Sequence, residues 1–411
     1  MPRGRLLVFT ENYARGGGNR YCVDLINALA PVFDEIVLAA NEGGIFAEDQ
    51  SRLAANVVVL PAAFVTRSRA RHVMRRIPRA ARAPALAVLS LAEPLLFRAN
   101  VALLSRMVRR IGPDVVLSCN GGYPAARAAL AMVMAAHRCK VPVALSVVSV
   151  PTPRRKWMIA YDRAIDLAIW RSAKLVIVNA RAIADALSAQ HDMPAHLARV
   201  VHNGLPDAPL PPNNESADAI GFVARLDRAK GVLVLFEAFR QLAPRWPLLK
   251  LRLVGHGDAS KEISRQAREF SLEDRVDADG HVAGDINSVL ASFRVYAFPS
   301  FHEGLPYSIL EAMRAGCPIV STAVGGIPEI VRDGSEALLV PPHDADALAA
   351  AIDRLLADEG TARRLGRAAR DRFERNHLLE RVATKVVNVF VESGMVAMKP
   401  THSGSQEQSR P

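Results

Sequence analysis

Residues 5–30 read RLLVFTENYARGGGNRYCVDLINALA, and this stretch decides the fold class. The segment from Arg5 to Thr10 is mostly apolar and predicts a buried strand. A glycine cluster follows, and from Tyr21 to Ala30 apolar residues recur at helical spacing. A strand, a glycine turn and a helix in this order are typical of the first unit of a doubly wound α/β domain.

The glycine cluster consists of Gly16, Gly17 and Gly18. Glycines at this position let a tight turn expose backbone N–H groups, and the N-terminus of the following helix favours a phosphate or another anion. The spacing is not that of the dinucleotide pattern G-x-G-x-x-G, because Tyr21 occupies the last glycine position. An ordinary strand-to-helix turn is therefore an equal alternative on this motif alone.

Further apolar runs alternate with helical patterns in both halves of the chain, which predicts parallel sheets covered by helices on both faces. Between the halves, Leu205 to Asp218 holds four prolines and two asparagines and predicts a linker. The other expected strands are Glu35 to Ala40, Val57 to Leu60, Asp114 to Ser118, Val141 to Val148, Leu175 to Asn179, Ala219 to Ala224, Lys250 to Val254, Val295 to Pro299, Pro318 to Thr322 and Ala337 to Val340.

This organisation predicts two doubly wound domains that face a central cleft, with a ligand in the cleft. A length of 411 residues suits two domains of ordinary size. The expected boundaries are an N-terminal domain at 1–205, a linker at 206–218, a C-terminal domain at 219–375, a helix at 376–397 that packs back on the N-terminal domain, and a disordered tail at 398–411.

The composition indicates a soluble globular protein, with 50% hydrophobic and 23% charged residues. No stretch reaches the roughly 20 apolar residues of a spanning helix, and the N-terminus lacks the sections of a signal peptide. We therefore expect a cytoplasmic protein. Its four cysteines have no paired spacing, which predicts buried free thiols rather than disulfides or a zinc site.

The net charge of +11 is concentrated in one window, residues 66–110, which holds eleven arginines and a single acid, Glu93. That window alone carries +10, and its arginines are mixed with apolar residues. Such a basic amphipathic insertion can lie on an anionic membrane, here the inner face, where each basic residue contributes roughly 1 kcal/mol. A solvated helical face is an equal alternative. Nucleic acid is not expected, because Phe97 is the only aromatic residue in the window.

Two groups of residues in the second domain could carry chemistry. Arg225 and Lys230 follow its first strand, where ligands lie in doubly wound sheets, and two cations there could bind a diphosphate. Residues 299–316 read PSFHEGLPYSILEAMRAG and place Glu303 on a loop after a strand. Pro306 suits the first turn of the following helix, and Glu311 lies about one turn along it. Carboxylates for hydroxyl groups thus lie beside free helix amides.

The pair Glu303 and Glu311 resembles the E-x7-E motif of the family 4 glycosyltransferases. The resemblance covers most of the second domain, from about Ala219 to Leu355. It runs through Phe298-Pro-Ser300, Gly316-Cys-Pro318, Gly325-Gly326, Glu329, Asp333-Gly334 and Pro341, and it also includes Arg225, Lys230, Asn203-Gly204 and Gly16 to Gly18.

The resemblance implies a retaining, hexosyltransferase-type enzyme of the GT-B fold that takes a nucleotide-diphosphate sugar, a UDP- or GDP-sugar, as its donor. Glu303, Arg225 and Lys230 would be catalytic: Glu303 contacts the sugar hydroxyls, and the two cations neutralise the diphosphate, so no metal ion and no cofactor is needed. The acceptor would be a glycan or a lipid-linked sugar in the synthesis of a cell-surface polysaccharide. The expected donor-binding residues are Gly16, Gly17, Gly18, Asn203, Val282, Gly304, Leu305, Pro306 and Glu311, the last of them on the ribose.

The first domain departs from the family pattern at one place. Family members often carry a histidine shortly after a strand like Val141 to Leu145, and this chain has Val148 and Ser149 there. A nucleotide-sugar-binding protein without catalytic activity is therefore one alternative. A sugar-nucleotide epimerase of the same fold is another, although the first domain shows no cluster of acids and bases for its proton transfers.

Overall fold

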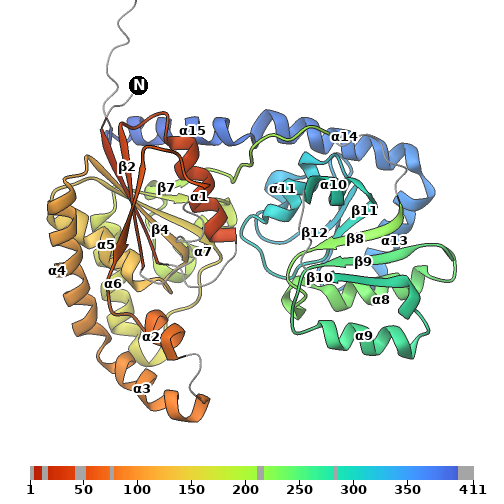
Figure 1. The fold of residues 1–411 in the computed structure, drawn as a ribbon, viewed down its shortest axis with the longest axis horizontal. Coiled ribbons are helices and arrows are strands. Elements are labelled where there is room, and N and C mark those ends of the chain that lie inside the picture. The colour runs from red at the N-terminus through yellow and green to blue at the C-terminus, as the bar shows by residue number, and fades with distance from the viewer. Residues whose placement is uncertain are drawn as a thin grey trace, which may run out of the picture.

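The computed structural model of the protein describes residues 4–11, 17–41, 52–74, 78–210, 217–280 and 286–396. Two parallel β-sheets, each flanked by helices, lie side by side along the long axis of the molecule (Figure 1). The first sheet comes from the N-terminal half of the chain and the second from the C-terminal half, as the two alternations in the sequence predict.

Within the described residues, the first sheet has the order β3-β2-β1-β4-β5-β6-β7, and its neighbouring strands are parallel. β1 lies near its centre, with Leu6 and Val8 in one buried core and Leu7 and Phe9 in the other. Burial on both faces explains the continuous apolar run of its sequence. The strands are β1 (Arg5–Thr10), β2 (Glu35–Asn41), β3 (Val57–Ala62), β4 (Val115–Gly122), β5 (Val143–Ser149), β6 (Leu175–Val178) and β7 (Ala198–Val200).

Helices cover both faces of this sheet. α1 packs in the core that contains Leu6 and Val8, and α4 and α5 pack in the core that contains Leu7 and Phe9. The helices are α1 (Gly17–Leu29), α2 (Arg67–Val73), α3 (Arg79–Leu91), α4 (Glu93–Ile111), α5 (Arg127–Arg138), α6 (Ile159–Ser172) and α7 (Arg181–His191), with short 3-10 turns at Lys156–Met158 and Ala195–Leu197.

The second sheet has the order β10-β9-β8-β11-β12-β13 and is also parallel within the described residues. Its strands are β8 (Ala217–Val223), β9 (Lys250–Val254), β10 (Val276–Gly280), β11 (Phe293–Phe298), β12 (Ile319–Thr322) and β13 (Leu338–Val340). Its helices are α8 (Val232–Leu242), α9 (Ser260–Glu269), α10 (Ile286–Ala291), α11 (Tyr307–Arg314), α12 (Ile327–Ile330), α13 (Ala345–Ala357) and α14 (Glu359–Asn376), with 3-10 turns at Arg228–Lys230 and Glu273–Arg275.

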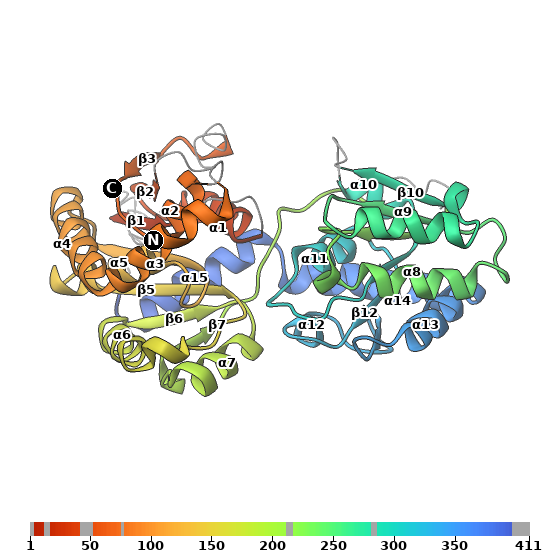
Figure 2. The same ribbon diagram turned by 90° about the horizontal axis from the view of Figure 1, so that it is seen from below.

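The chain crosses between the two domains twice, once after β7 and once between α14 and α15 (Leu379–Glu392). The two crossings pair with each other: the Leu205 N–H donates to the His377 carbonyl at 3.0 Å, and the Leu379 N–H donates to the Leu205 carbonyl at 2.9 Å. Beyond the crossing, Val386 and Phe390 of α15 are fully buried in the N-terminal domain's core with α1. In Figure 2, α15 lies behind the N-terminal domain and α14 lies behind the C-terminal domain.

The basic window contains α2, α3 and α4, which form an outer layer of the N-terminal domain (Figure 1). Among the described residues, no single helix has the length and apolarity needed to cross a bilayer, although Pro84–Leu91 and Glu93–Ile111 reach them together and are bent by 66°. Of the four cysteines, all free, Cys139 is partly exposed and the other three are buried.

Candidate functional site

Glu303 and Lys230 form a close ion pair at the carboxyl ends of the second sheet's strands. Lys230 Nζ lies 2.6 Å from Glu303 Oε1 and 5.7 Å from the centre of the Phe298 ring. Glu303 is only 8% exposed, so Lys230 supplies a counter-charge that this carboxylate needs. The structure therefore brings together two of the three residues that the sequence predicts to be catalytic.

Local backbone features place Lys230 beside Glu303. Asp227 caps the short turn that carries Lys230, and its Oδ1 accepts the Lys230 backbone N–H at 3.0 Å. The next residue, Gly231, has a φ of 71°, and any side chain there would overlap the Pro299 carbonyl. Glycine thus allows the start of α8 to touch the end of β11, and this contact brings the lysine into reach of the loop.

The backbone of Glu303 and Gly304 lies between two other segments. On one side, Gly325 has a φ of 55° and touches the Glu303 carbonyl, and the Gly326 N–H donates to the Gly304 carbonyl at 2.7 Å. On the other side lies the N-terminal domain, because a methyl group added to Gly304 would come within 2.8 Å of the Val148 carbonyl. The loop that carries Glu303 is therefore at the junction of the two domains.

The next residues lead into α11. Leu305 is 4% exposed and its carbonyl accepts a hydrogen bond from Asn203 Nδ2 at 3.0 Å. Pro306 precedes the first helical residue, and no described side chain caps the helix start. The first backbone amides of α11 therefore stay open to a ligand. Glu311, one turn further along, is 6% exposed.

Glu311 is held by a residue of the other domain that the sequence reasoning missed. Arg20 Nη1 donates to Glu311 Oε1, while the Arg20 guanidinium lies 5.2 Å from the centre of the Tyr307 ring and 3.5 Å from Asp24. Burial works against its charge, but Glu311 and Asp24 outweigh that effect and raise the pKa of Arg20 above its ordinary value. A cation two positions after the glycine cluster and an aspartate four residues after that cation were the available signals.

The glycine cluster lies partly in α1 itself. Gly17 and Gly18 are the first two helical residues, so the helix begins before the expected Tyr21. A methyl group on Gly17 would lie 3.5 Å from the Tyr307 ring, which places the N-terminus of α1 opposite the start of α11. Two predicted donor-binding residues, Gly16 and Val282, lie outside the described residues.

Arg225 is not part of this cluster. Its side chain is 75% exposed and pairs with Asp227 at 3.0 Å, two residues along the chain. The sequence grouped Arg225 with Lys230, and the structure shows only Lys230 in contact with Glu303. The Arg225 side chain is therefore engaged only by an exposed ion pair, whereas Lys230 is held against Glu303.

Val148, which stands where a histidine is often found in the resembling family, faces the same region. A methyl group on Gly18 would lie 4.0 Å from Val148 Cγ2, and the Val148 carbonyl accepts from Asn179 Nδ2 at 3.1 Å. The position therefore lies between the α1 start and the Glu303 loop, where it offers only an apolar side chain.

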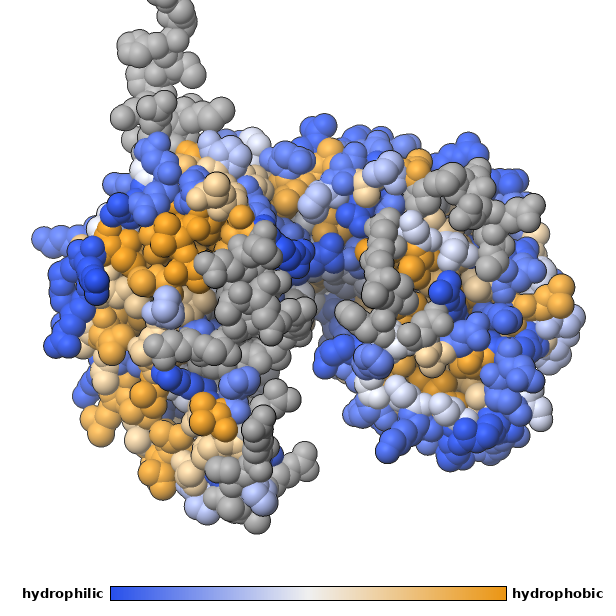
Figure 3. All heavy atoms as spheres, in the orientation of Figure 1, coloured by the Kyte–Doolittle hydropathy of each residue, from blue (hydrophilic) through white to orange (hydrophobic). Residues whose placement is uncertain are grey.

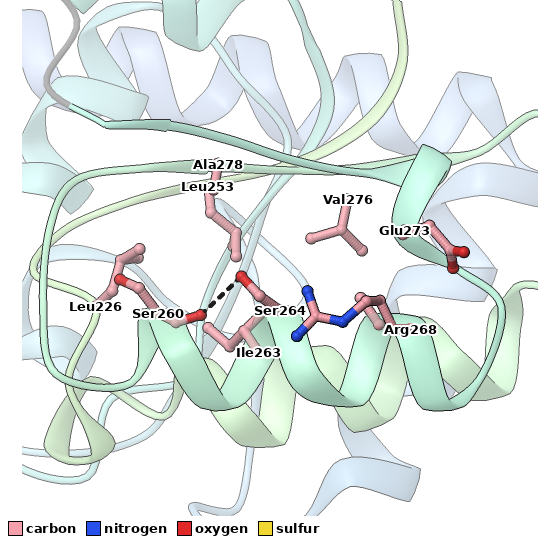
Figure 4. A pocket seen from close by; sticks show the side chains of 10 residues that line it. Leu226, Leu253, Ser260, Ile263, Ser264, Arg268, Glu273, Val276 and Ala278 are labelled. Atoms are coloured by element: carbon pink, nitrogen blue, oxygen red, sulfur yellow. Dashed lines mark hydrogen bonds between the residues drawn. The ribbon is translucent and has the colours of Figure 1, made fainter.

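The C-terminal domain also contains a cavity of about 170 Å³ between α9 and the strands β9 and β10 (Figure 4). Its lining is mostly apolar and includes none of the catalytic or donor-binding residues predicted from the sequence. Figure 4 shows Arg268 and Glu273 toward one end of it, and the Ser264 hydroxyl donates within α9 to the Ser260 carbonyl at 3.0 Å. This cavity is separate from the cluster at the domain junction.

The cluster at the junction suits a ligand that carries both hydroxyl groups and negative charge. Two nearly buried carboxylates can accept hydrogen bonds from hydroxyls, and Lys230, Arg20 and the starts of two helices favour an anion. Among the described residues, no group of three metal-binding side chains is present. The arrangement matches the chemistry of a sugar joined to a diphosphate.

Two protein families match the chain, one for each half. Residues 15–208 match Glycosyltransferase Family 4, and residues 210–372 match Glycosyl transferases group 1. The boundary between the two matches falls in the proline-rich segment between the two sheets.

Similar proteins support these matches. The chain is 36% identical over 137 residues to the colanic acid biosynthesis glycosyltransferase WcaL of Salmonella typhimurium, a match that covers 32% of this chain and 34% of that protein. It is 33% identical over 159 residues to the amylovoran biosynthesis glycosyltransferase AmsK of Erwinia amylovora, covering 37% and 39%. These matches thus span little more than a third of each relative's length.

Among solved structures, Alr3699/HepE of Anabaena in complex with UDP has a TM-score of 0.74 at 20% identity, over 94% of this chain and all of that one. Together with the two parallel sheets, this likeness confirms the expected GT-B fold.

Proposed function

Because this chain belongs to the group 1 and family 4 glycosyltransferase superfamily, we propose that it transfers a sugar from a nucleotide-diphosphate donor to a glycan or lipid-linked acceptor in polysaccharide synthesis. The observation that carries the proposal is the Lys230–Glu303 ion pair with its nearly buried carboxylate, together with Glu311 and the N-terminus of α1 at the junction of the two domains.

Each part of the cluster has a role in this proposal. Glu303 accepts hydrogen bonds from the sugar hydroxyls, and Glu311 accepts them from the ribose. Lys230, with Arg225 turned inward from the rim, neutralises the diphosphate as it leaves. The N-terminus of α1 at Gly17 and Gly18 and the uncapped start of α11 would add further hydrogen-bond donors. Catalysis then consists mainly of positioning and charge stabilisation.

The donor is proposed to be a UDP- or GDP-sugar. UDP is the nucleotide in the solved Anabaena structure of the same fold, which favours testing UDP-sugars first. The reaction is proposed to retain the anomeric configuration, through attack on the same face that the diphosphate leaves. The diphosphate oxygen would take the proton of the acceptor hydroxyl. Proton NMR of the product would show the same anomeric configuration as in the donor, and an inverted product would contradict this part of the proposal.

The experiment that tests transfer is a screen for nucleotide release with UDP- and GDP-sugars in the presence of glycan and lipid-linked acceptors. We expect one donor to give acceptor-dependent release, and Glu303→Ala and Lys230→Ala to reduce it by at least about 100-fold, because each removes a group that acts at the reacting centre. Leu248→Ala serves as the control, because this leucine is 79% exposed and precedes β9, at the opposite end of the strands from this cluster. Full activity in both site variants would refute the assignment.

Val148 favours one alternative function, that of a protein that binds a nucleotide sugar without transferring the sugar. An apolar side chain between Gly18 and the Glu303 loop cannot replace a histidine's hydrogen bond to the donor sugar. The same screen separates the two functions. Binding of UDP or GDP without release, over the whole acceptor panel, would favour the binding protein. Acceptor-dependent release favours the transferase.

An anionic membrane surface is the second partner that we propose, held by residues 66–110. The corner between α3 and α4 exposes Val88, Leu91 and Leu95 by 64%, 72% and 70%. Figure 3 shows apolar residues gathered at the lower left, over the position of these helices. A window that carries +10 and presents apolar side chains at its tip has the chemistry that binds anionic lipid.

An ion pair connects the basic window to an exposed tryptophan that lies outside it in the sequence. Arg155 makes two hydrogen bonds to Glu93 at the start of α4, at 2.6 and 2.9 Å. Its guanidinium also lies 5.5 Å from the centre of the Trp157 ring, and Trp157 is 57% exposed. Arg155 therefore contacts both the start of α4 and an exposed tryptophan. Tryptophan is enriched where one end of a side chain meets lipid and the other meets water.

Sedimentation with vesicles tests this partner. We expect the protein to sediment with phosphatidylcholine vesicles that contain phosphatidylglycerol and to remain in solution with phosphatidylcholine alone. The double variant Leu91→Asp and Leu95→Asp should lose most of that binding. Leu248→Asp, at a leucine of the other domain that is 79% exposed, is the matched control. Equal recovery with both kinds of vesicle would reject the membrane surface.

A further inference from the structure

One ion pair connects the two domains inside the proposed donor site. Arg20 is on the first turn of α1 in the N-terminal domain, and Glu311 is on α11 in the C-terminal domain. Arg20 Nη1 donates to Glu311 Oε1, so the carboxylate proposed to bind the ribose is already engaged from the opposite domain. The Tyr307 ring lies under the same guanidinium, at 5.2 Å from its centre.

Loss of the Arg20–Glu311 ion pair would be unfavourable, because the carboxylates around Arg20 are nearly buried. Glu311 and Asp24 are 6% and 8% exposed, and Arg20 is the cation that contacts both. Burial already raises the pKa of Asp24 above its ordinary value, and Arg20 is the first of the charges that oppose the rise. Without Arg20, two carboxylates of low exposure would lie close together without the cation that contacts both, and Glu311 would lose the group that fixes its orientation.

The neighbouring residue supplies an independent sign of a ligand. Asn19 is 4% exposed, and neither its Nδ2 nor its Oδ1 has a hydrogen-bond partner among the residues that the structure describes. A buried side-chain amide without partners loses free energy unless something else bonds to it. Asn19 follows Gly18 and precedes Arg20, at the helix start that faces the Glu303 loop.

We propose that Arg20 is a positioning residue for the donor, which orients and neutralises Glu311 so that its free oxygen accepts the ribose hydroxyls. This inference rests on the proposed function. Arg20 acts through Glu311 and does not itself touch the reacting atoms. Because it reaches Glu311 from the other domain, the ribose contact is fully formed only when the two domains are held together as they are here.

The test compares a nucleotide with its 2′-deoxy form, because only a contact to the ribose hydroxyl distinguishes the two. Titration calorimetry would measure the Kd of UDP and of 2′-deoxy-UDP, or of the guanine pair if GDP is the nucleotide that binds. For the unaltered protein we expect the deoxy form to bind at least about 10-fold more weakly. Glu311→Gln should reduce that ratio to about 2-fold or less.

Arg20→Ala should reduce the ratio to the same level as Glu311→Gln, and the double variant should reduce it no further, since both act on one contact. Arg20→Lys keeps the charge and should preserve an intermediate ratio, which protects the test if the alanine variant folds poorly. The matched control is Glu329→Gln. Glu329 also joins the domains, by accepting the backbone N–H groups of Arg181 and Ala182 at 2.9 and 3.1 Å, but it is not in contact with Glu311.

Three outcomes are decisive. A loss of ribose preference in Arg20→Ala with the preference intact in Glu329→Gln supports the inference. A full ribose preference in Arg20→Ala and Arg20→Lys overturns it and leaves the proposed function standing. If the unaltered protein binds neither UDP nor GDP, the proposed function fails, and the role of Arg20 fails with it.

Discussion

Lys230 and Arg225 match the same family pattern, and the structure gives them different surroundings. Lys230 is mostly buried against Glu303, whereas Arg225 is 75% exposed. The sequence could predict that both residues follow the first strand of the second domain, because strand and turn signals are local. It could not predict Arg20 as the partner of Glu311, because the two are 291 residues apart and meet only through the packing of two domains.

The two cations should therefore differ in their effect on stability. Lys230→Ala leaves Glu303 nearly buried without its counter-charge, and we expect a loss of about 1–3 kcal/mol, which would lower the Tm by several degrees. Arg225→Ala removes an exposed side chain and should leave the Tm within about 1 °C, although it weakens donor binding. Differential scanning calorimetry of both variants checks this contrast. An equal fall in Tm for the two would contradict the difference in burial.

The element scale shows where sequence patterns work and where they fail. β1 has the expected bounds because a strand buried on both faces reads as a continuous apolar run, and β9 has them because its leucines alternate with charged residues. β7 and β10 were not predicted, and both are edge strands. β10 reads VDADG, with charge at alternate positions, so it lacks the apolar run of a central strand. The helix expected at 376–397 corresponds to α15, which begins only at Leu379 because His377 and Leu378 separate it from α14.

His377 at that interruption should make the pairing of the two crossings sensitive to acid. It is 2% exposed, and burial lowers its pKa to about 3, although the Asn203 carbonyl at 3.2 Å opposes the shift. In the unfolded chain its pKa would be about 6.5. Below pH 6.5 the unfolded chain therefore binds a proton at His377, whereas the folded protein binds this proton only near pH 3. The free energy of unfolding is therefore not reduced by His377 above pH 6.5, and it decreases as the pH falls from 6.5 to about 3.

We expect His377 to cost the protein about 2 kcal/mol of folding stability between pH 7 and pH 5. Urea unfolding at the two pH values would measure the cost, and His377→Gln should remove most of it because glutamine does not titrate. His196→Gln, at an exposed histidine, is the control and should keep the slope of the unaltered protein. If His377→Gln and the unaltered protein lose the same stability on acidification, the pKa of His377 is not depressed in the fold.

At the scale of the whole molecule, the function depends on how the two domains meet. Arg20 and Glu311, Gly304 and Val148, and Glu329 with the start of α7 all join them, and the paired crossings at Leu205 and Leu378 close the other side. Alternating patterns predict two domains and a linker, since each domain's signals are local. Which surfaces of the two domains contact each other depends on residues far apart in the sequence. The family resemblance predicted a cleft between the domains but not these contacts.

A ligand that binds at the junction should stabilise the whole protein. With UDP or GDP at about 100 times its Kd, the gain in folding free energy is about 2.7 kcal/mol, which corresponds to a rise in Tm of several degrees. Thermal unfolding with and without each nucleotide measures this gain, and Glu311→Gln should reduce it. A rise that is unchanged in Glu311→Gln would show that the nucleotide binds elsewhere, for instance in the cavity beside α9.

The most direct test of the central claim is a crystal structure of the protein with the nucleotide bound. We predict the diphosphate between the start of α1 and Lys230, with the ribose hydroxyls on Glu311 and with Arg20 still in contact with that carboxylate. A nucleotide bound away from the domain junction, with the Lys230–Glu303 and Arg20–Glu311 pairs untouched, would contradict the account.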